Sequence, residues 1–164
     1  MIDVAAATAL VTPLADALRA KGWRLATAES CTGGLIAAAC TTLAGSSDWF
    51  ERGFVTYSNA AKCEQLGIDA ALIAAHGAVS AEVASAMAAG ALRHSMADIA
   101  VAVTGIAGPA GGVPGKPVGT VWLALMRRGG TAQVERLQLD GDRASVRAQS
   151  VVIALQRLAA LCTA

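Results

Sequence analysis

The chain has 164 residues, a formal net charge of +1, 55% hydrophobic residues and 4% aromatic residues. A chain of this length can bury roughly two thirds of its unfolded surface, so we expect one domain over residues 1–164. No run of lysine or arginine is present, which argues against a nucleic-acid partner. No apolar stretch reaches the roughly 18 residues that a membrane span needs, and the N-terminus lacks the basic start of a signal peptide. We therefore expect a soluble, cytoplasmic protein without a membrane partner.

Hydrophobic periodicity and turn signals predict the secondary structure. In chain order they indicate a helix over residues 2–21, a strand over 24–29, a helix over 35–43 and a strand over 50–57. A helix that carries Lys62 follows, with Ser58-Asn59 as its N-cap, and then one or two helical turns over 69–76 and a helix over 80–95. Strands over 98–104, 118–127 and 132–139 and a helix over 142–161 complete the chain. The candidates for the buried face of the first helix are Val4, Leu10, Leu14 and Leu18. The mixture of crossover units with one hairpin predicts a three-layer α/β/α sandwich with a mixed sheet.

The cysteines and histidines lack metal-binding spacing. They are Cys31, Cys40, Cys63, Cys162, His76 and His94. No two cysteines are separated by two residues, and the histidines lie far from them in sequence, so we expect no metal site. Free thiols in a reducing cytoplasm are the simpler explanation.

The segment AESCTGG, residues 28–34, joins the end of a predicted strand to a turn and to two glycines that open a helix. Ligands of α/β folds collect at the carboxyl ends of strands, and a helix N-terminus offers unpaired N–H groups with partial positive charge. Ser30 could therefore be a nucleophile beside an oxyanion hole formed by the amides of residues 31–34. A simpler role, in which Ser30 or Thr32 only caps the helix, also fits this segment.

A serine nucleophile needs a base, and Lys62 of the segment VTYSNAAK is the candidate. Small residues precede it, and a lysine in a dehydrated pocket has a lowered pKa and can accept a proton. Tyr57, the one tyrosine of the chain, could donate or relay a proton. A surface lysine and a half-buried tyrosine without catalytic roles are the alternatives, and His76 and His94 lie in settings typical of structural histidines.

The segment TGIAGPAGGVPGKPVGT, residues 104–120, follows the central strand and is rich in glycine and proline, so its backbone can approach a ligand closely. It matches neither the P-loop nor the Rossmann glycine pattern. Further along, Arg143 and Arg147 lie one helical turn apart at the start of the last helix and could grip a phosphate. They could equally be solvated or paired with acids.

Together these segments resemble a known family. The stretches AESCTGGLIA, GSSDWFERGFVTYSNAAK, GAVS, TGIAGPAGG, KPVGTV and GDR are similar, in this order, to motifs of the CinA C-terminal-domain family, whose active members are nicotinamide-nucleotide amidases. The resemblance covers about residues 27–147. It implies a three-layer α/β/α sandwich with a mixed, mainly parallel five-stranded sheet, commonly assembled as a homodimer.

The resemblance also implies hydrolysis of nicotinamide mononucleotide to nicotinic acid mononucleotide and ammonia, without cofactor or metal. By motif position, Ser30 would be the nucleophile, Lys62 its general base and Tyr57 an assistant in proton transfer. The substrate would be bound by Cys31, Thr32, Gly33, Gly34, Asn59, Thr104, Gly105 and Arg143. Many family members also carry an N-terminal domain linked to pyrophosphatase activity, and since its motifs are absent from this sequence we do not expect that activity.

Two other interpretations stay open. Cys31 also lies at a helix N-terminus, which would lower its pKa, and it could be the nucleophile in place of Ser30. Alternatively, the chain could be a catalytically silent nucleotide-binding module with a regulatory or scaffold role. Release of ammonia would distinguish the enzyme from the binding module.

Overall fold

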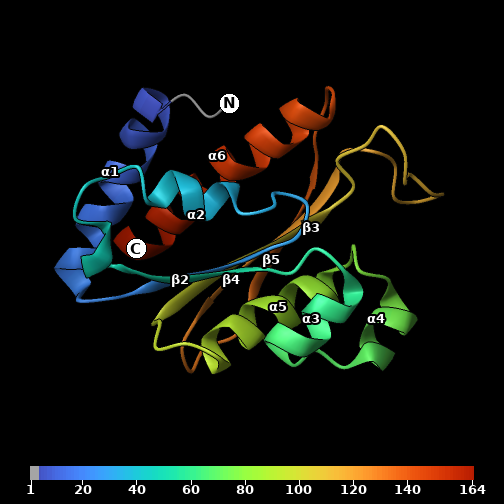
Figure 1. The fold of residues 1–164 in the computed structure, drawn as a ribbon, viewed down its shortest axis with the longest axis horizontal. Helices are drawn as coiled ribbons and strands as arrows, with labels where there is room; N and C mark the ends of the chain where they lie inside the picture. The colour runs from blue at the N-terminus through green and yellow to red at the C-terminus, as the bar shows by residue number, and fades with distance from the viewer. Residues whose placement is uncertain (1–3) are drawn as a thin grey trace.

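A computed structural model describes residues 4–164 as a sheet covered by helices on both faces (Figure 1). One face is covered by α1 (Val4–Lys21), α2 (Leu35–Cys40) and α6 (Arg143–Thr163). The other face is covered by α3 (Asn59–Leu66), α4 (Ala70–His76) and α5 (Ala81–Arg93). The predicted three-layer α/β/α sandwich is therefore confirmed. Positions 2 and 3 of the first predicted helix, and the side chain of Val4, lie outside the described part of the protein.

The sheet formed by residues 4–164 has five strands in the order β2-β1-β3-β4-β5. The strands are β1 (Leu25–Glu29), β2 (Phe50–Val55), β3 (Ile99–Gly105), β4 (Thr120–Arg127) and β5 (Gln133–Gln138). Strand β1 is parallel to β2 and β3, whereas β4 is antiparallel to β3 and β5. The mixed sheet is thus confirmed, and its parallel part brings the carboxyl ends of β1, β2 and β3 to one edge.

The two faces of the sheet carry side chains of different size. Val101 of β3 lies in a solvent-free cluster with Leu14 and Leu18, which were predicted to be buried on α1. Its neighbour Ala102 lies on the opposite face, in a cluster with Met87 of α5. The alternation follows from the period of two in a strand. Several sheet residues on the α5 face are alanines, so this helix packs against small side chains.

Hydroxyl side chains mark the ends of several helices. The Oγ atoms of Ser58 and Ser80 accept hydrogen bonds from the third amide of α3 and of α5, at 3.0 and 3.2 Å, as expected for N-caps. The helix predicted over 35–43 is too long, since α2 ends at Cys40. There the Thr41 hydroxyl donates to the Ala37 carbonyl at 3.0 Å and competes with the continuing backbone. No helix within residues 4–164 is long and apolar enough to cross a membrane.

Gly90 sets the distance between α5 and the end of α3. A β-carbon at position 90 would lie 2.8 Å from the Leu66 side chain and even closer to the Leu66 carbonyl oxygen. Alanine is favoured over glycine by about 1 kcal/mol inside a helix, but overpacking of this kind costs about 1–3 kcal/mol. We therefore expect Gly90→Ala to lower the free energy of unfolding by about 1 kcal/mol net, measured by urea denaturation.

The control for this substitution is Ser85→Ala, on the same helix at a half-buried position. It gains helix propensity without a clash and should leave stability unchanged or slightly raised. Equal or greater stability of Gly90→Ala relative to wild type would contradict the close packing of α3 on α5.

Candidate active site

Ser30 follows β1 directly, at the edge where the parallel strands end. Its amide donates to the Val103 carbonyl at 3.0 Å, and its carbonyl accepts from the Gly33 amide at 3.0 Å. Gly33 and Gly34 have φ angles of 59° and 95°, in the left-handed region that favours glycine. The glycine pair thus allows the chain to reverse immediately after the serine and to enter α2.

Lys62 reaches Ser30 from α3. The lysine is 1% exposed, and its Nζ lies 3.0 Å from Ser30 Oγ. Nζ also donates to the carbonyls of Thr56 and Tyr57, at 3.0 and 3.3 Å. Both carbonyls lie beyond the sheet because β2 ends at Val55. The strand predicted over 50–57 is therefore two residues too long. The predicted pairing of serine and lysine is present in the structure.

The surroundings of the Lys62 amine favour its uncharged form. Among residues 4–164 no carboxylate forms an ion pair with it, and burial lowers the pKa of Lys62 below its ordinary value of 10.5. A neutral amine has two N–H groups and one lone pair. The carbonyls of Thr56 and Tyr57 can accept both N–H groups, which leaves the lone pair for the Ser30 hydroxyl. This geometry can remove the serine proton without a histidine.

Glu29 supports the nucleophile turn, residues 30–34, from within the protein. The residue is fully buried, and its carboxylate accepts hydrogen bonds from the amides of Gly34, Ile36 and Ala37 at 3.1, 3.0 and 2.8 Å. Amides at a helix N-terminus carry partial positive charge and here take the place of a cation. This role was not predicted, although a carboxylate that closes an otherwise apolar strand is itself a signal for such partners.

The amides of the nucleophile turn differ in their availability. Those of Gly33 and Gly34 already donate to the Ser30 carbonyl and to the buried carboxylate. Those of Cys31 and Thr32 have no hydrogen-bond partner in the described part of the chain. Across a trans peptide the Cys31 amide points away from the Ser30 carbonyl. The amides still available for the predicted oxyanion hole are therefore the first two after the serine, and their role stays a prediction.

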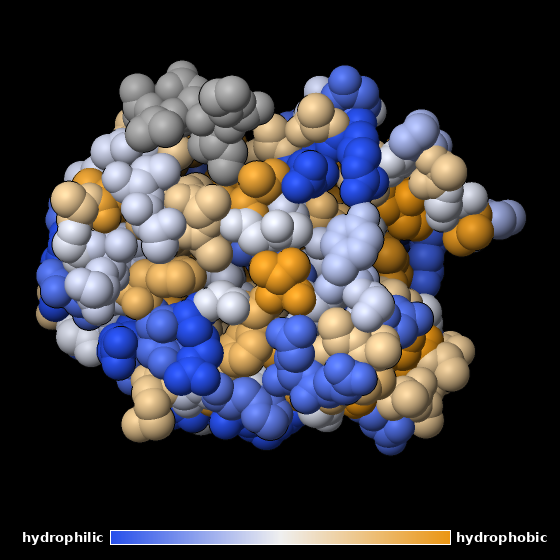
Figure 2. Space-filling view, viewed as in Figure 1, coloured by the Kyte–Doolittle hydropathy of each residue, from blue (hydrophilic) through white to orange (hydrophobic). Residues whose placement is uncertain are grey.

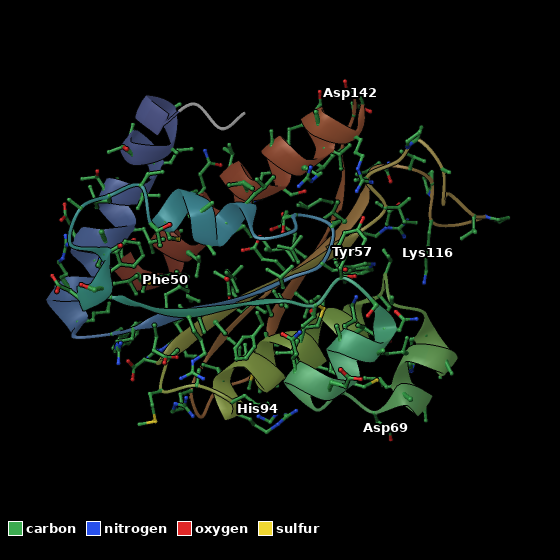
Figure 3. All side chains as sticks on the ribbon, in the orientation of Figure 1. Phe50, Tyr57, Asp69, His94, Lys116 and Asp142 are labelled. Atoms are coloured by element: carbon green, nitrogen blue, oxygen red, sulfur yellow. The ribbon has the colours of Figure 1, made fainter. Side chains whose placement is uncertain are left out.

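Tyr57 and Arg143 meet beside this turn. Arg143 Nη2 donates to the Tyr57 hydroxyl at 2.8 Å, and its Nη1 donates to the Gly108 carbonyl at 3.0 Å. Figure 3 shows Tyr57 in the space between the end of β2 and the loops below the start of α6, where Asp142 is labelled. Tyr57 is 58% exposed, and within residues 4–164 its hydroxyl makes no hydrogen bond to the serine or the lysine. Its part in proton transfer therefore stays a prediction.

Arg147 donates two hydrogen bonds to the backbone of the nucleophile turn, and its predicted contact with a phosphate stays a prediction. Its Nε donates to the Cys31 carbonyl at 3.1 Å and its Nη2 to the Thr32 carbonyl at 3.2 Å. Within residues 4–164 the Arg147 guanidinium forms no ion pair with an acid, and it is only partly exposed to solvent, so neither alternative role holds. The guanidinium instead ties α6 to the nucleophile turn, a contact between residues 116 and 115 positions apart that the sequence did not reveal.

The remaining predicted binding residues lie at different places. Thr104 is 1% exposed and donates its hydroxyl to a backbone carbonyl before α5 at 2.8 Å. Gly105 ends β3, so close to β4 that a β-carbon would lie 2.7 Å from a valine side chain there. Asn59 is exposed and lines a hollow of about 350 Å³ between α3 and α4. The structure joins none of these side chains to the serine–lysine pair within residues 4–164, so their substrate contacts stay predictions.

Cys31 has the wrong electrostatics for a nucleophile. Burial raises the pKa of its thiol to about 11, although the charges of Arg147 and Lys62 act in the opposite sense. The expectation that the helix N-terminus lowers this pKa is therefore wrong, because desolvation outweighs it. At neutral pH the Cys31 thiol keeps its proton, whereas Ser30 Oγ lies within hydrogen-bonding distance of the Lys62 amine.

A hollow of about 480 Å³ adjoins the two arginines. It is lined by Ala107, Pro109, Val118, Gly141, Asp142, Arg143, Ala144 and Arg147. Figure 2 shows hydrophilic surface over the N-terminal end of α6. Guanidinium groups beside apolar loop residues suit an anionic molecule with a nonpolar part. No grouping of His, Cys, Asp and Glu among residues 4–164 could hold a metal ion.

The fold and site define an α/β/α sandwich with a serine hydrogen-bonded to a buried lysine at the edge of the sheet. Residues 7–162 match the family model of the CinA C-terminal domain. The chain belongs to this family, so the resemblance seen in its motifs is confirmed.

Relatives and solved structures agree with this membership. The nicotinamide-nucleotide amidohydrolase PncC of Pseudomonas putida is 54% identical over 156 residues, which are 95% of this chain and 97% of that protein. The protein of the same name from Escherichia coli K12 is 52% identical over 143 residues, 87% of each chain. The crystal structure of the competence/damage inducible protein CihA from Agrobacterium tumefaciens has a TM-score of 0.91 at 46% identity, with 94% of both chains covered.

Alkylation of the thiols tests the burial of Cys31. We expect iodoacetamide at about pH 7.5 to modify half-buried Cys63 first, while Cys31 and Cys40 react slowly. Burial raises the pKa of Cys31 to about 11 and that of Cys40 to about 12, so little thiolate is present. Peptide mass spectrometry over time measures the order, with Cys63→Ala as the control. Rapid labelling of Cys31 would reopen its candidacy as the nucleophile.

Proposed function

We propose that this protein is a nicotinamide-nucleotide amidase that hydrolyses nicotinamide mononucleotide to nicotinic acid mononucleotide and ammonia. The observation that carries the proposal is the 3.0 Å contact between Ser30 Oγ and the buried amine of Lys62. The names of relatives at 52% and 54% identity, nicotinamide-nucleotide amidohydrolase, support the substrate class. Ser30 acts as the nucleophile and Lys62 as the general base.

In the first half of the reaction, the neutral amine of Lys62 takes the Ser30 proton while Oγ attacks the carboxamide carbon of the nicotinamide ring. The negative charge that forms on the carbonyl oxygen is stabilised by the amide of Cys31 or Thr32. One well-placed donor of this kind contributes about 2.7–4 kcal/mol. The carbon–nitrogen bond then breaks, and the nitrogen receives the proton from Lys62, with assistance from Tyr57, and leaves as ammonia.

In the second half, water attacks the acyl carbon of the ester on Ser30 and gives a proton to Lys62. The bond from carbon to Oγ breaks, and Oγ recovers a proton from the lysine. One water is consumed for each ammonia released, and the carboxylic acid product gives its proton to ammonia, which leaves carboxylate and ammonium. No step calls for a cofactor.

The hollow at the start of α6 accommodates the nucleotide part of the substrate in this proposal. Arg143 is held by the Tyr57 hydroxyl and by the Gly108 carbonyl, and its guanidinium would meet the phosphate or the ribose. The exposed ring of Tyr57 would lie against the pyridinium ring, whose positive charge favours an aromatic face.

The first test is release of ammonia from nicotinamide mononucleotide by wild type and Ser30→Ala, with EDTA present. We expect the variant to lose more than about 10³-fold in rate with its melting temperature preserved, because only the attacking atom is removed. EDTA should make no difference. Thermal stabilisation of the wild type by the mononucleotide without release of ammonia would support the silent binding module and contradict the proposal.

The pH dependence tests Lys62 as the base. Burial favours the neutral amine and lowers its pKa below 10.5, so kcat/KM should rise with pH along a limb whose midpoint lies below that value. Lys62→Arg should lose activity across the whole range, because a guanidinium cannot accept a proton near neutral pH. Lys21→Met is the control, since Lys21 ends α1 and stacks on Trp23 away from the site. A limb unchanged in Lys62→Arg would contradict the assignment.

A further inference from the structure

We propose, on the basis of the proposed function, that Arg147 is a positioning residue that orients the nucleophile turn so that the Cys31 and Thr32 amides face the reacting carbonyl. The geometry is the fork of hydrogen bonds from Nε and Nη2 to the carbonyls of Cys31 and Thr32, at 3.1 and 3.2 Å. Charge-assisted bonds of this kind are stronger and more directional than bonds between neutral groups. Arg147 thus acts through the backbone and does not itself touch the reacting atoms.

The fork fixes which way the amides of the turn point. In a trans peptide the carbonyl and the following N–H point in opposite directions. The bond from Arg147 to the Cys31 carbonyl therefore directs the Thr32 amide away from the guanidinium. The hydrogen bond to the Thr32 carbonyl likewise directs the Gly33 amide away from the guanidinium. The Gly33 amide donates to the Ser30 carbonyl at 3.0 Å. That last bond in turn directs the Cys31 amide to the opposite side.

Each peptide from residue 30 to residue 34 is consequently held by a hydrogen bond. Glu29 secures the last one, since its carboxylate accepts from the Gly34 amide at 3.1 Å. The amides left without a partner in the described part of the chain are those of Cys31 and Thr32. Preorganised donors that need not move during the reaction are what stabilises a developing oxyanion.

Arg147 lies on a helix, α6, that is anchored in the hydrophobic core. Val151, Leu155 and Leu158 of the same helix are 6%, 1% and 0% exposed, and they anchor α6 in the core with α1 and α2. The positive charge also has the right sign, because it lowers the pKa of the Cys31 thiol against the larger effect of burial. A field that favours a thiolate at position 31 also favours an oxyanion beside the neighbouring serine.

The competing role for Arg147 is that of a phosphate ligand, because it also lines the 480 Å³ hollow with Arg143. The two roles differ in what they affect. A phosphate ligand would change KM for the mononucleotide and would not matter to a reagent without a phosphate recognition group. A positioning residue would change the reactivity of Ser30 toward any electrophile whose oxygen needs the same amides.

The experiment compares wild type with Arg147→Met, Arg147→Lys and the control Arg157→Met. Arg157 lies on the same helix but pairs with Glu135 at 2.8 Å on the surface. Steady-state release of ammonia from nicotinamide mononucleotide gives kcat and KM. Labelling with a fluorophosphonate gives the reactivity of Ser30: Oγ bonds to phosphorus, fluoride leaves, and Lys62 takes the serine proton. Thermal melting reports whether each variant is folded.

We expect Arg147→Met to reduce kcat and the labelling rate by a similar factor of about 10–100, with KM little changed and the protein still folded. Arg147→Lys keeps the charge but cannot fork onto both carbonyls, so it should restore only part of the loss. Arg157→Met should match the wild type. Wild-type labelling rates in both Arg147 variants, or a loss confined to KM, would overturn the positioning role.

The failure of the proposed function has a different signature. In that case the wild type would be labelled at Ser30 but would release no ammonia from the mononucleotide. The ratio of labelling rates between wild type and Arg147→Met would still decide the role of Arg147. If Arg147→Met does not fold, Arg147→Lys provides the test. A rate of Ser30 labelling in Arg147→Lys equal to that of the wild type would then contradict the proposal.

Discussion

The buried amine of Lys62 is the constraint on which the site depends. A charged amine without a carboxylate partner is costly to bury, so its place requires acceptors for its N–H groups. The carbonyls of Thr56 and Tyr57 supply them, because β2 ends at Val55 and frees both from the ladder. Ser58 then caps α3, whose first turn carries the lysine back toward the strand end. The end of one strand and the start of one helix thus bury the amine and place it beside the Ser30 hydroxyl.

Much of the architecture follows from local patterns and was predicted from them. The strand of alternating small and branched residues around Val101, the cap at Ser80 and the hairpin between β4 and β5 depend on periods and turn signals that a short window contains. The meeting of Ser30 with Lys62 follows from parallel pairing, since Glu29 lies opposite Val55 and the residues after each strand begin side by side. The short 3-10 helix Ser46–Asp48 was not predicted, and the other errors lie at element ends, such as the end of α2, where the Thr41 hydroxyl competes with the backbone.

The parts of the site that could not be predicted depend on contacts between distant residues. The partners of Arg147 lie 115 and 116 positions away, and those of Arg143 include a hydroxyl 86 positions away. No period or motif specifies where a long arginine side chain ends. The pKa of Cys31 was predicted wrongly for a related reason: burial, which depends on the whole fold, raises it more than the residue's own backbone amide lowers it.

The contribution of α6 to the site has a consequence for the order in which the parts of the site come together. The serine and the lysine belong to the first half of the chain, whereas Arg143 and Arg147 arrive with its last helix. A fragment clipped before α6 would keep Ser30 and Lys62 but would lack both arginines. Docking of α6 would therefore complete the proposed site, since before it docks the turn after Ser30 lacks the backbone hydrogen bonds that Arg147 donates.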